Sequence, residues 1–152
     1  MDTLRWQAGT LFLLDQTKLP FEEIYLPCHS WQDVRQAISV LAVRGAPAIG
    51  VAAAYAVVLA ARSLCQKGEN EPFVTALEAI CRDLDAARPT AVNLHWALTR
   101  MMDCARQHAA DGPEAVTAAL EKKAMAIHAA DVAINTAMAR YGADELAKIG
   151  RP

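Results

Sequence analysis

Apolar and polar residues alternate along the first thirty positions of the chain, in two short runs and then a third. The runs 3–7 and 10–15 flank Ala8-Gly9, and this arrangement is typical of a β-hairpin with a two-residue turn. A break at 18–20 follows, and a third strand is expected at 23–27. The pattern therefore predicts a small antiparallel sheet at the start of the chain.

After Cys28 the apolar residues recur every three or four positions, which is the period of an amphipathic helix. Five helices are predicted, each preceded by a polar cap or opened by a proline. The expected helix starts are a cap at Ser30, then Pro47, Glu71-Pro72, a position near Thr90, and Pro113. The first helix is expected to end near Leu41, and the second near Cys65 before a loop at 66–70.

The fifth predicted helix is long. An apolar stripe runs along it at Val116, Leu120, Ile127, Ile134, Met138 and Tyr141. Gly142 suits the left-handed position after a helix end, and a short helical tail is expected at 144–149. A helix of about 28 residues would measure about 42 Å, more than the width of a domain of this size. It is therefore expected to reach a second domain or a partner subunit.

These elements define an α+β fold, a mostly helical bundle of about five helices with a short N-terminal antiparallel sheet. The predicted domain spans residues 1–152, with the sheet in 1–28 and the helices in 29–152. Of the residues, 54% are hydrophobic and 21% are charged, which describes a folded globular protein. The uncharged stretch 46–61 is shorter than the roughly 20 residues of a membrane span, so we expect a buried core helix and no membrane association.

Charge and cysteine content narrow the function classes. The net charge of −2 provides no basic field for a nucleic acid backbone. None of the four cysteines forms a Cys-x-x-Cys pair or stands at zinc-ligand spacing from a histidine, so no metal site is expected. The first residues have no charged leader before an apolar core, which predicts a cytoplasmic protein with reduced thiols.

Two segments share a pattern that suits anion binding. In Arg44-Gly45-Ala46-Pro47 and in Arg88-Pro89-Thr90-Ala91, an arginine stands just upstream of a proline and small residues that open a helix. Free N–H groups and the positive end of the helix dipole collect at a helix start, and an arginine adds a planar cationic fork that matches phosphate oxygens. If the two starts converge, they form a phosphate cradle.

The alternative is that both segments are ordinary helix starts, because proline is common in the first turn of a helix. The other reactive side chains suggest no catalytic site. The cysteines are expected to be inert thiols, the three tryptophans packing anchors, and Asp15 a turn residue. His95, His108 and His128 have no partner that the pattern identifies. Asp131 and Asn135 are read as polar packing at a subunit seam or as a solvated face.

Three blocks of sequence resemble the methylthioribose-1-phosphate isomerase family. They are Trp6 with Leu14-Asp15-Gln16 and Leu19-Pro20, then 43–50 with Ala53-Ala54-Tyr55, and then 88–94. The resemblance implies an aldose–ketose isomerase that converts 5-methylthioribose 1-phosphate to 5-methylthioribulose 1-phosphate in methionine salvage. It also implies a fold shared with the regulatory subunits of eukaryotic initiation factor 2B, a homodimer, and no cofactor. By this resemblance Arg44, Gly45, Ala46 and Arg88 contact the sugar phosphate.

The resemblance also implies that the catalytic groups lie outside these residues. The family's catalytic cysteine and aspartate belong to a Rossmann-like domain that would follow Pro152, so no catalytic residue is expected within this chain. Three hypotheses stay open: an isomerase domain that is inactive alone, a regulatory module that binds a sugar phosphate or a nucleotide, and a purely structural helical domain. A homo-oligomer or the missing C-terminal domain is the expected macromolecular partner.

Overall fold

The computed structural model describes residues 2–68 and 72–149 and begins with a three-stranded antiparallel sheet. Its strands are β1 (Leu4–Gln7), β2 (Thr10–Leu14) and β3 (Tyr25–Cys28), in the order β1-β2-β3. Leu4 pairs with Leu13 and Trp6 with Leu11. Ala8 and Gly9 both adopt positive φ, as a tight hairpin turn requires. The predicted sheet is confirmed, with β3 displaced by two residues at its start.

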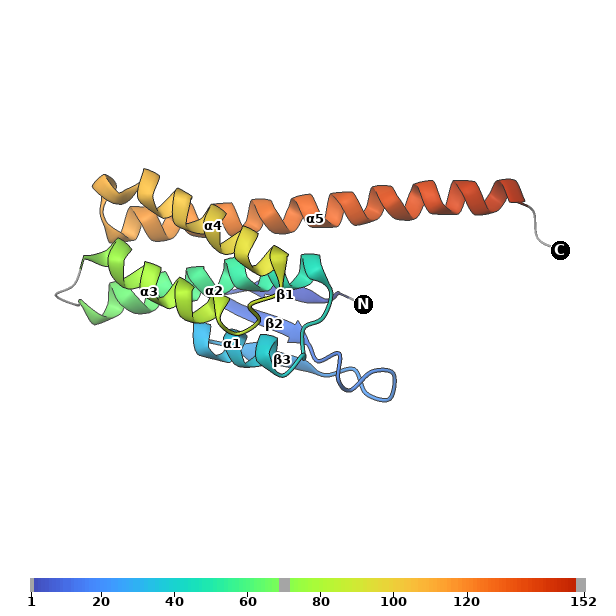
Figure 1. Ribbon diagram of the computed structural model, residues 1–152, viewed down its shortest axis with the longest axis horizontal. Helices are drawn as coiled ribbons and strands as arrows, with labels where there is room; N and C mark the ends of the chain where they lie inside the picture. Colours follow the sequence, from blue (N-terminus) through green and yellow to red (C-terminus); the bar gives the residue numbers. More distant parts are fainter. Residues whose placement is uncertain (1, 69–71, 150–152) are drawn as a thin grey trace.

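Within the part of the chain that the structure describes, five α-helices follow the sheet, as the sequence predicts, and the fold is α+β and mostly helical (Figure 1). They are α1 (Trp31–Ser39), α2 (Ala46–Lys67), α3 (Phe73–Asp85), α4 (Val92–Gln107) and α5 (Pro113–Ile149). A short 3-10 helix, η1 (Ala109–Asp111), was not predicted. The expected loop begins later than predicted, because α2 runs to Lys67 and ends on a left-handed Gly68. Residues 69–71 lie outside the described part.

The start of α1 shows how local sequence positions an element. The Ser30 hydroxyl accepts a hydrogen bond from the Asp33 N–H at 3.2 Å, and the Asp33 carboxylate accepts one from the Ser30 N–H at 2.9 Å. This reciprocal pair is a capping box. Burial raises the pKa of the Asp33 carboxyl, but hydrogen bonds from Ser30 and His29 outweigh that effect, so its pKa lies below 3.8. The N-cap predicted at Ser30 is therefore confirmed.

Helix α2 forms the centre of the core. Every residue from Ile49 to Ala61 is buried, and α1, α3, α4 and α5 all pack on it. The alanines in this segment leave room for neighbouring helices to approach closely. α2 is also long and apolar enough to cross a membrane, but 78% of its most apolar window is buried inside the fold. Helix α2 is therefore the buried core helix that the sequence predicts.

Helix α5 differs from its prediction. It runs without a break from Pro113 to Ile149, 37 residues, or about 55 Å at 1.5 Å per residue. The predicted end at Gly142 is wrong, and the expected tail is the last part of the same helix. A glycine inside a helix costs only about 1 kcal/mol relative to alanine, so one glycine does not end a long alanine-rich helix.

Only the first half of α5 is covered by the rest of the fold. Val116, Leu120 and Ile127 are buried, whereas Ile134, Met138 and Tyr141, which continue the same stripe, are exposed. The second half projects past the other elements toward the C-terminus (Figure 1). The predicted stripe therefore exists, and its distal part is an apolar surface without a partner among the described residues.

Candidate functional site

The first of the two candidate segments forms the start of α2. Gly45 is the N-cap, with φ of +90°, in the left-handed region that side chains with a Cβ rarely adopt. No atom lies within 4 Å of the place where a Cβ would stand, so the backbone angle and not the space requires glycine here. Gly45, Ala46 and Pro47 are exposed, and no side chain caps the first turn. The free N–H groups of this helix start are therefore open to an external acceptor.

Arg44 is exposed and makes two hydrogen bonds, one through its side chain and one through its backbone. Its Nε donates to the Leu41 carbonyl at 3.2 Å, and its own carbonyl accepts from the Gln16 side-chain amide at 3.3 Å. Asp15, beside Gln16, accepts hydrogen bonds from the Thr17 N–H and hydroxyl at 3.0 and 2.6 Å, which confirms its predicted turn role. The segment after β2 thus fixes the loop that carries Arg44.

The second candidate segment forms the start of α4. Arg88 is half-buried, and its carbonyl accepts from the Ala91 N–H at 3.0 Å, closing a turn. Ala91 is the N-cap and provides no side-chain hydrogen bond. The first turn of α4, like that of α2, therefore presents N–H groups without a side-chain acceptor.

The two helix starts lie against each other. A Cβ added to Gly50, in the second turn of α2, would lie 3.0 Å from the Asn93 carbonyl oxygen in the first turn of α4. The starts of both helices lie side by side in Figure 1. The starts of α2 and α4 are therefore neighbours, as a phosphate cradle would require. Which groups contact a ligand remains a prediction for Arg44, Gly45, Ala46 and Arg88.

A cavity of about 560 Å³ adjoins the two helix starts and is closed on a third side by α5. Pro47 and Gly50 of α2, and Val92 and Asn93 of α4, contribute to its wall. The four predicted site residues do not line it. Arg44, Gly45 and Arg88 lie on the loops before the two helices, and Ala46 is the first residue of α2.

Several residues of this cavity were missed by sequence reasoning. Trp96 was expected to be a packing anchor, but its side chain is 47% exposed and lines the cavity. The Arg100 guanidinium carbon lies 4.8 Å from the centre of the Trp96 ring. Val92, Trp96 and Arg100 are four residues apart on one face of α4, and this spacing is the signal that could have joined them to the site.

On the α5 side, Lys123, Asp131 and Asn135 line the cavity beside Ile127 and Ile134. The sequence predicts that Asp131 and Asn135 either pack at an interface between subunits or lie on a solvated face. The structure places them at the cavity and also along a second groove, of about 580 Å³, between α5 and β1. The cavity therefore combines apolar walls with a few polar groups, as small-molecule sites usually do.

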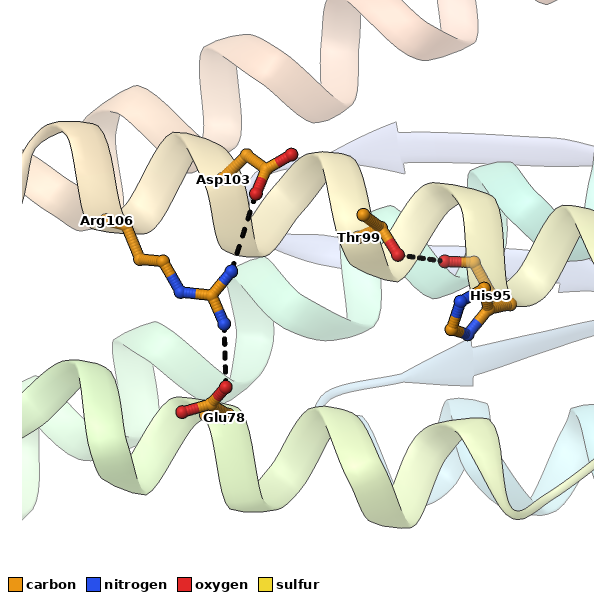
Figure 2. Close-up of polar contacts among 5 residues, drawn as sticks. All are labelled: Glu78, His95, Thr99, Asp103 and Arg106. Carbon is orange, nitrogen blue, oxygen red and sulfur yellow. Dashed lines mark hydrogen bonds and ion pairs between the residues drawn. The ribbon is translucent and has the colours of Figure 1, made fainter.

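Ion pairs between α3 and α4 fix the helix that carries this wall. Arg106 bonds to Glu78 of α3 at 2.6 Å and to Asp103 at 3.4 Å (Figure 2). His95 Nδ1 lies 3.2 Å from an Asp85 carboxylate oxygen, and the Thr99 hydroxyl donates to the His95 carbonyl at 3.0 Å (Figure 2). The Arg106–Glu78 and His95–Asp85 pairs join α4 to α3 at two points, although exposed pairs of this kind contribute little stability individually.

The structure gives each of the three histidines a partner that the sequence pattern does not identify. Besides the His95–Asp85 pair, His108 Nδ1 lies 3.0 Å from the Cys104 carbonyl oxygen, and His128 Nδ1 lies 3.1 Å from the Tyr55 hydroxyl. The His128–Tyr55 contact spans 73 positions, so no local pattern predicts it. Each of these three histidines therefore has a structural contact.

The cysteines behave as the sequence predicts. All four are free thiols, and Cys28, Cys81 and Cys104 are buried. Burial raises the pKa of Cys28 to about 12, and it raises the pKa of Cys81 to about 12 as well. A thiol must ionise to act as a nucleophile, so neither can do so near neutral pH. Among residues 2–68 and 72–149, no three His, Cys, Asp or Glu side chains cluster as metal ligands.

A sequence comparison identifies the class of protein that this fold and site represent. A family model described as "Initiation factor 2 subunit family" matches residues 42–149, which include both candidate segments and nearly all the helices. The chain therefore belongs to the initiation factor 2 subunit family.

Individual relatives are more specific. A methylthioribose-1-phosphate isomerase from Pelotomaculum thermopropionicum is 52% identical over 143 residues, which cover 93% of this chain and 39% of the relative. The crystal structure of 5-methylthioribose 1-phosphate isomerase from Pyrococcus horikoshii matches with a TM-score of 0.84 at 31% identity, covering 93% of this chain and 40% of that one.

A second solved structure also resembles this chain. Subunit delta of translation initiation factor eIF-2B from A. fulgidus matches with a TM-score of 0.76 at 32% identity, covering 87% of this chain and 38% of that one. The chain thus spans about two fifths of the length of the relatives it matches.

Proposed function

We propose that this chain is the N-terminal domain of an aldose–ketose isomerase that converts 5-methylthioribose 1-phosphate to 5-methylthioribulose 1-phosphate, and that it holds the phosphate of the sugar. The observation that carries the proposal is the packing of two arginine-bearing, uncapped helix starts against each other. The isomerase relatives, at 52% and 47% identity, supply the substrate class. Arg44, Gly45, Ala46 and Arg88 are the proposed phosphate-contacting residues.

The chemistry of the described residues suits phosphate binding better than proton transfer. The buried thiols of Cys28 and Cys81 have raised pKa values, and His95, in the first turn of α4, is paired with Asp85. We therefore assign proton transfer at the sugar to groups that this 152-residue chain does not contain. The chain alone would bind the phosphate ester without turning it over. The proposed setting is the cytoplasm, in a homo-oligomer.

A regulatory role is the second candidate, and the match to the eIF-2B delta subunit favours it. The two solved structures have nearly equal identity to this chain, 31% and 32%, so fold comparison alone does not separate the two functions. The higher identity of the isomerase relatives favours the first. A regulatory module would use the same helix starts for a nucleotide phosphate.

Titration of the chain with 5-methylthioribose 1-phosphate by calorimetry tests the proposed function. Arg44→Ala is expected to weaken binding roughly 10- to 100-fold, because a charge-assisted hydrogen bond contributes about 1.5–3 kcal/mol. Arg140→Ala is the matched control. It removes the same charge from an exposed position on the distal half of α5, and affinity should stay unchanged. Equal affinity in Arg44→Ala and wild type would exclude Arg44 from the site, and tighter binding of a nucleotide would favour the regulatory function.

A further inference from the structure

The loop between α1 and α2, residues 40–45, carries Arg44 between two left-handed residues. Leu41 has φ of +62° and Gly45 has φ of +90°. Leu41 follows the C-cap of α1, a position where glycine is usual because a Cβ disfavours positive φ. The Leu41 side chain is 40% exposed, so its burial does not account for this conformation. The turn therefore serves the course of the backbone.

The left-handed turn presents a carbonyl to the side chain of Arg44. Arg44 Nε donates to the Leu41 carbonyl at 3.2 Å. A guanidinium has five N–H donors, and this bond uses one of them. The other four belong to the two terminal nitrogens, which have no hydrogen-bond or ion-pair partner within residues 2–68 and 72–149. The side chain is therefore held at Nε and free at the pair of nitrogens that can bond to a phosphate.

Gln16, in the segment after β2, bonds to this loop on both sides of Val43. Its N–H donates to the Ala42 carbonyl at 2.9 Å, and its side-chain amide donates to the Arg44 carbonyl at 3.3 Å. Ala42 and Val43 are each 1% exposed, so the loop is also anchored in the core just before Arg44. In the described part of the chain, Gln16 is the only side chain that bonds to Arg44.

We propose that Gln16 is a positioning residue for phosphate binding. It holds the loop so that the Leu41 carbonyl keeps its bond to Arg44 Nε, and the terminal nitrogens of Arg44 stay available to a phosphate. This role rests on the proposed function, which assigns the phosphate to Arg44. An arginine whose orientation is set before binding loses less conformational entropy when the ligand arrives. Gln16 thus affects affinity through Arg44 without contacting the ligand.

Calorimetry with 5-methylthioribose 1-phosphate on the 152-residue chain tests this role. Gln16→Ala removes the amide, and Gln16→Glu keeps the size of the side chain but leaves no donor for the Arg44 carbonyl at neutral pH. Each variant is expected to bind the ester roughly 2- to 10-fold more weakly, the range for ordering one flexible side chain. Gln7→Ala is the matched control, since Gln7 is exposed at the end of β1, and its affinity should equal that of the wild type.

A double-mutant cycle separates positioning from a general loosening of the fold. If Gln16 acts through Arg44, adding Gln16→Ala to Arg44→Ala should weaken binding by less than about twofold. A second readout needs no ligand, since the Arg44 Nε–H resonance should exchange with water several-fold faster in Gln16→Ala than in the wild type. Leu41→Gly keeps the carbonyl and tolerates positive φ, so its affinity and its Arg44 Nε–H exchange should match the wild type.

Failure of the positioning role differs from failure of the proposed function. Wild-type affinity in both Gln16→Ala and Gln16→Glu, with weakened binding in Arg44→Ala, would overturn the positioning role and leave the phosphate site in place. An equal loss from Gln16→Ala in the wild-type and Arg44→Ala backgrounds would also overturn it, because Gln16 would then act independently of Arg44. Wild-type affinity in Arg44→Ala would overturn the proposed function and the positioning role together.

Discussion

Leu94→Ala is expected to lower the free energy of unfolding by about 2–5 kcal/mol, the usual range for removing a fully buried leucine. Leu94 is 0% exposed and lies in the first turn of α4, against the core built on α2. Its removal leaves a cavity where the two helix starts meet. Denaturant unfolding followed by circular dichroism would measure the loss. An unchanged dependence of the unfolding free energy on denaturant concentration would show that the variant still unfolds in a two-state manner.

Val92→Ala provides the control for this prediction. Val92 is two residues away on the same helix turn, but it is 78% exposed, so its truncation should change stability by no more than about 0.5 kcal/mol. Similar losses in the two variants would contradict the burial assigned to Leu94. Such a result would also contradict the conclusion that packing of Leu94 holds the start of α4 in place.

Gly50→Val is expected to destabilise the fold by about 3 kcal/mol, near the upper end of overpacking effects. A Cβ at Gly50 would stand 3.0 Å from the Asn93 carbonyl oxygen, which belongs to a helix backbone and cannot rotate away as a side chain could. The two added methyl groups would force the first turns of α2 and α4 apart. Binding of a phosphate ester should weaken together with stability, because the proposed cradle depends on that approach.

Gly142→Val is the matched control, since Gly142 is also inside a helix. No atom lies within 4 Å of a Cβ placed there, and valine has a slightly better helix propensity than glycine. Its unfolding midpoint and its ligand affinity should be unchanged or slightly higher. A wild-type midpoint in Gly50→Val would show that the two helix starts do not touch as described.

Local signals explain most of what could be predicted about the fold. The Ser30 cap, the Ala8-Gly9 turn and the prolines at helix starts act through their immediate neighbours, so the number, order and approximate bounds of the elements follow from the sequence. The two arginine-bearing helix starts were also recognisable locally. The sequence could say only that a phosphate cradle forms if the two helix starts lie together. The close approach of Gly50 to Asn93 shows that these helix starts are neighbours.

Features that depend on distant partners were missed. The contact of His128 with Tyr55 spans 73 positions and that of Trp6 with Glu121 spans 115, and no local pattern encodes them. The apolar stripe of α5 was visible, but not that it is uncovered from Ile134 onward. Trp96 was misread because a tryptophan on a helix face has the same pattern whether it faces a core or a cavity. Gly142 was misread because glycine permits a helix end without requiring one.

Reconstitution of isomerase activity tests the central claim most directly. The chain would be mixed with a separately produced C-terminal part of the Pelotomaculum thermopropionicum relative, the portion that this chain does not match, and turnover of 5-methylthioribose 1-phosphate would be followed. We predict no turnover by either part alone, turnover by the mixture, and a loss of roughly tenfold or more when Arg44→Ala replaces the wild type. Turnover by the 152-residue chain alone, or a mixture equally active with Arg44→Ala, would contradict the claim that this chain holds the phosphate while other residues perform the chemistry.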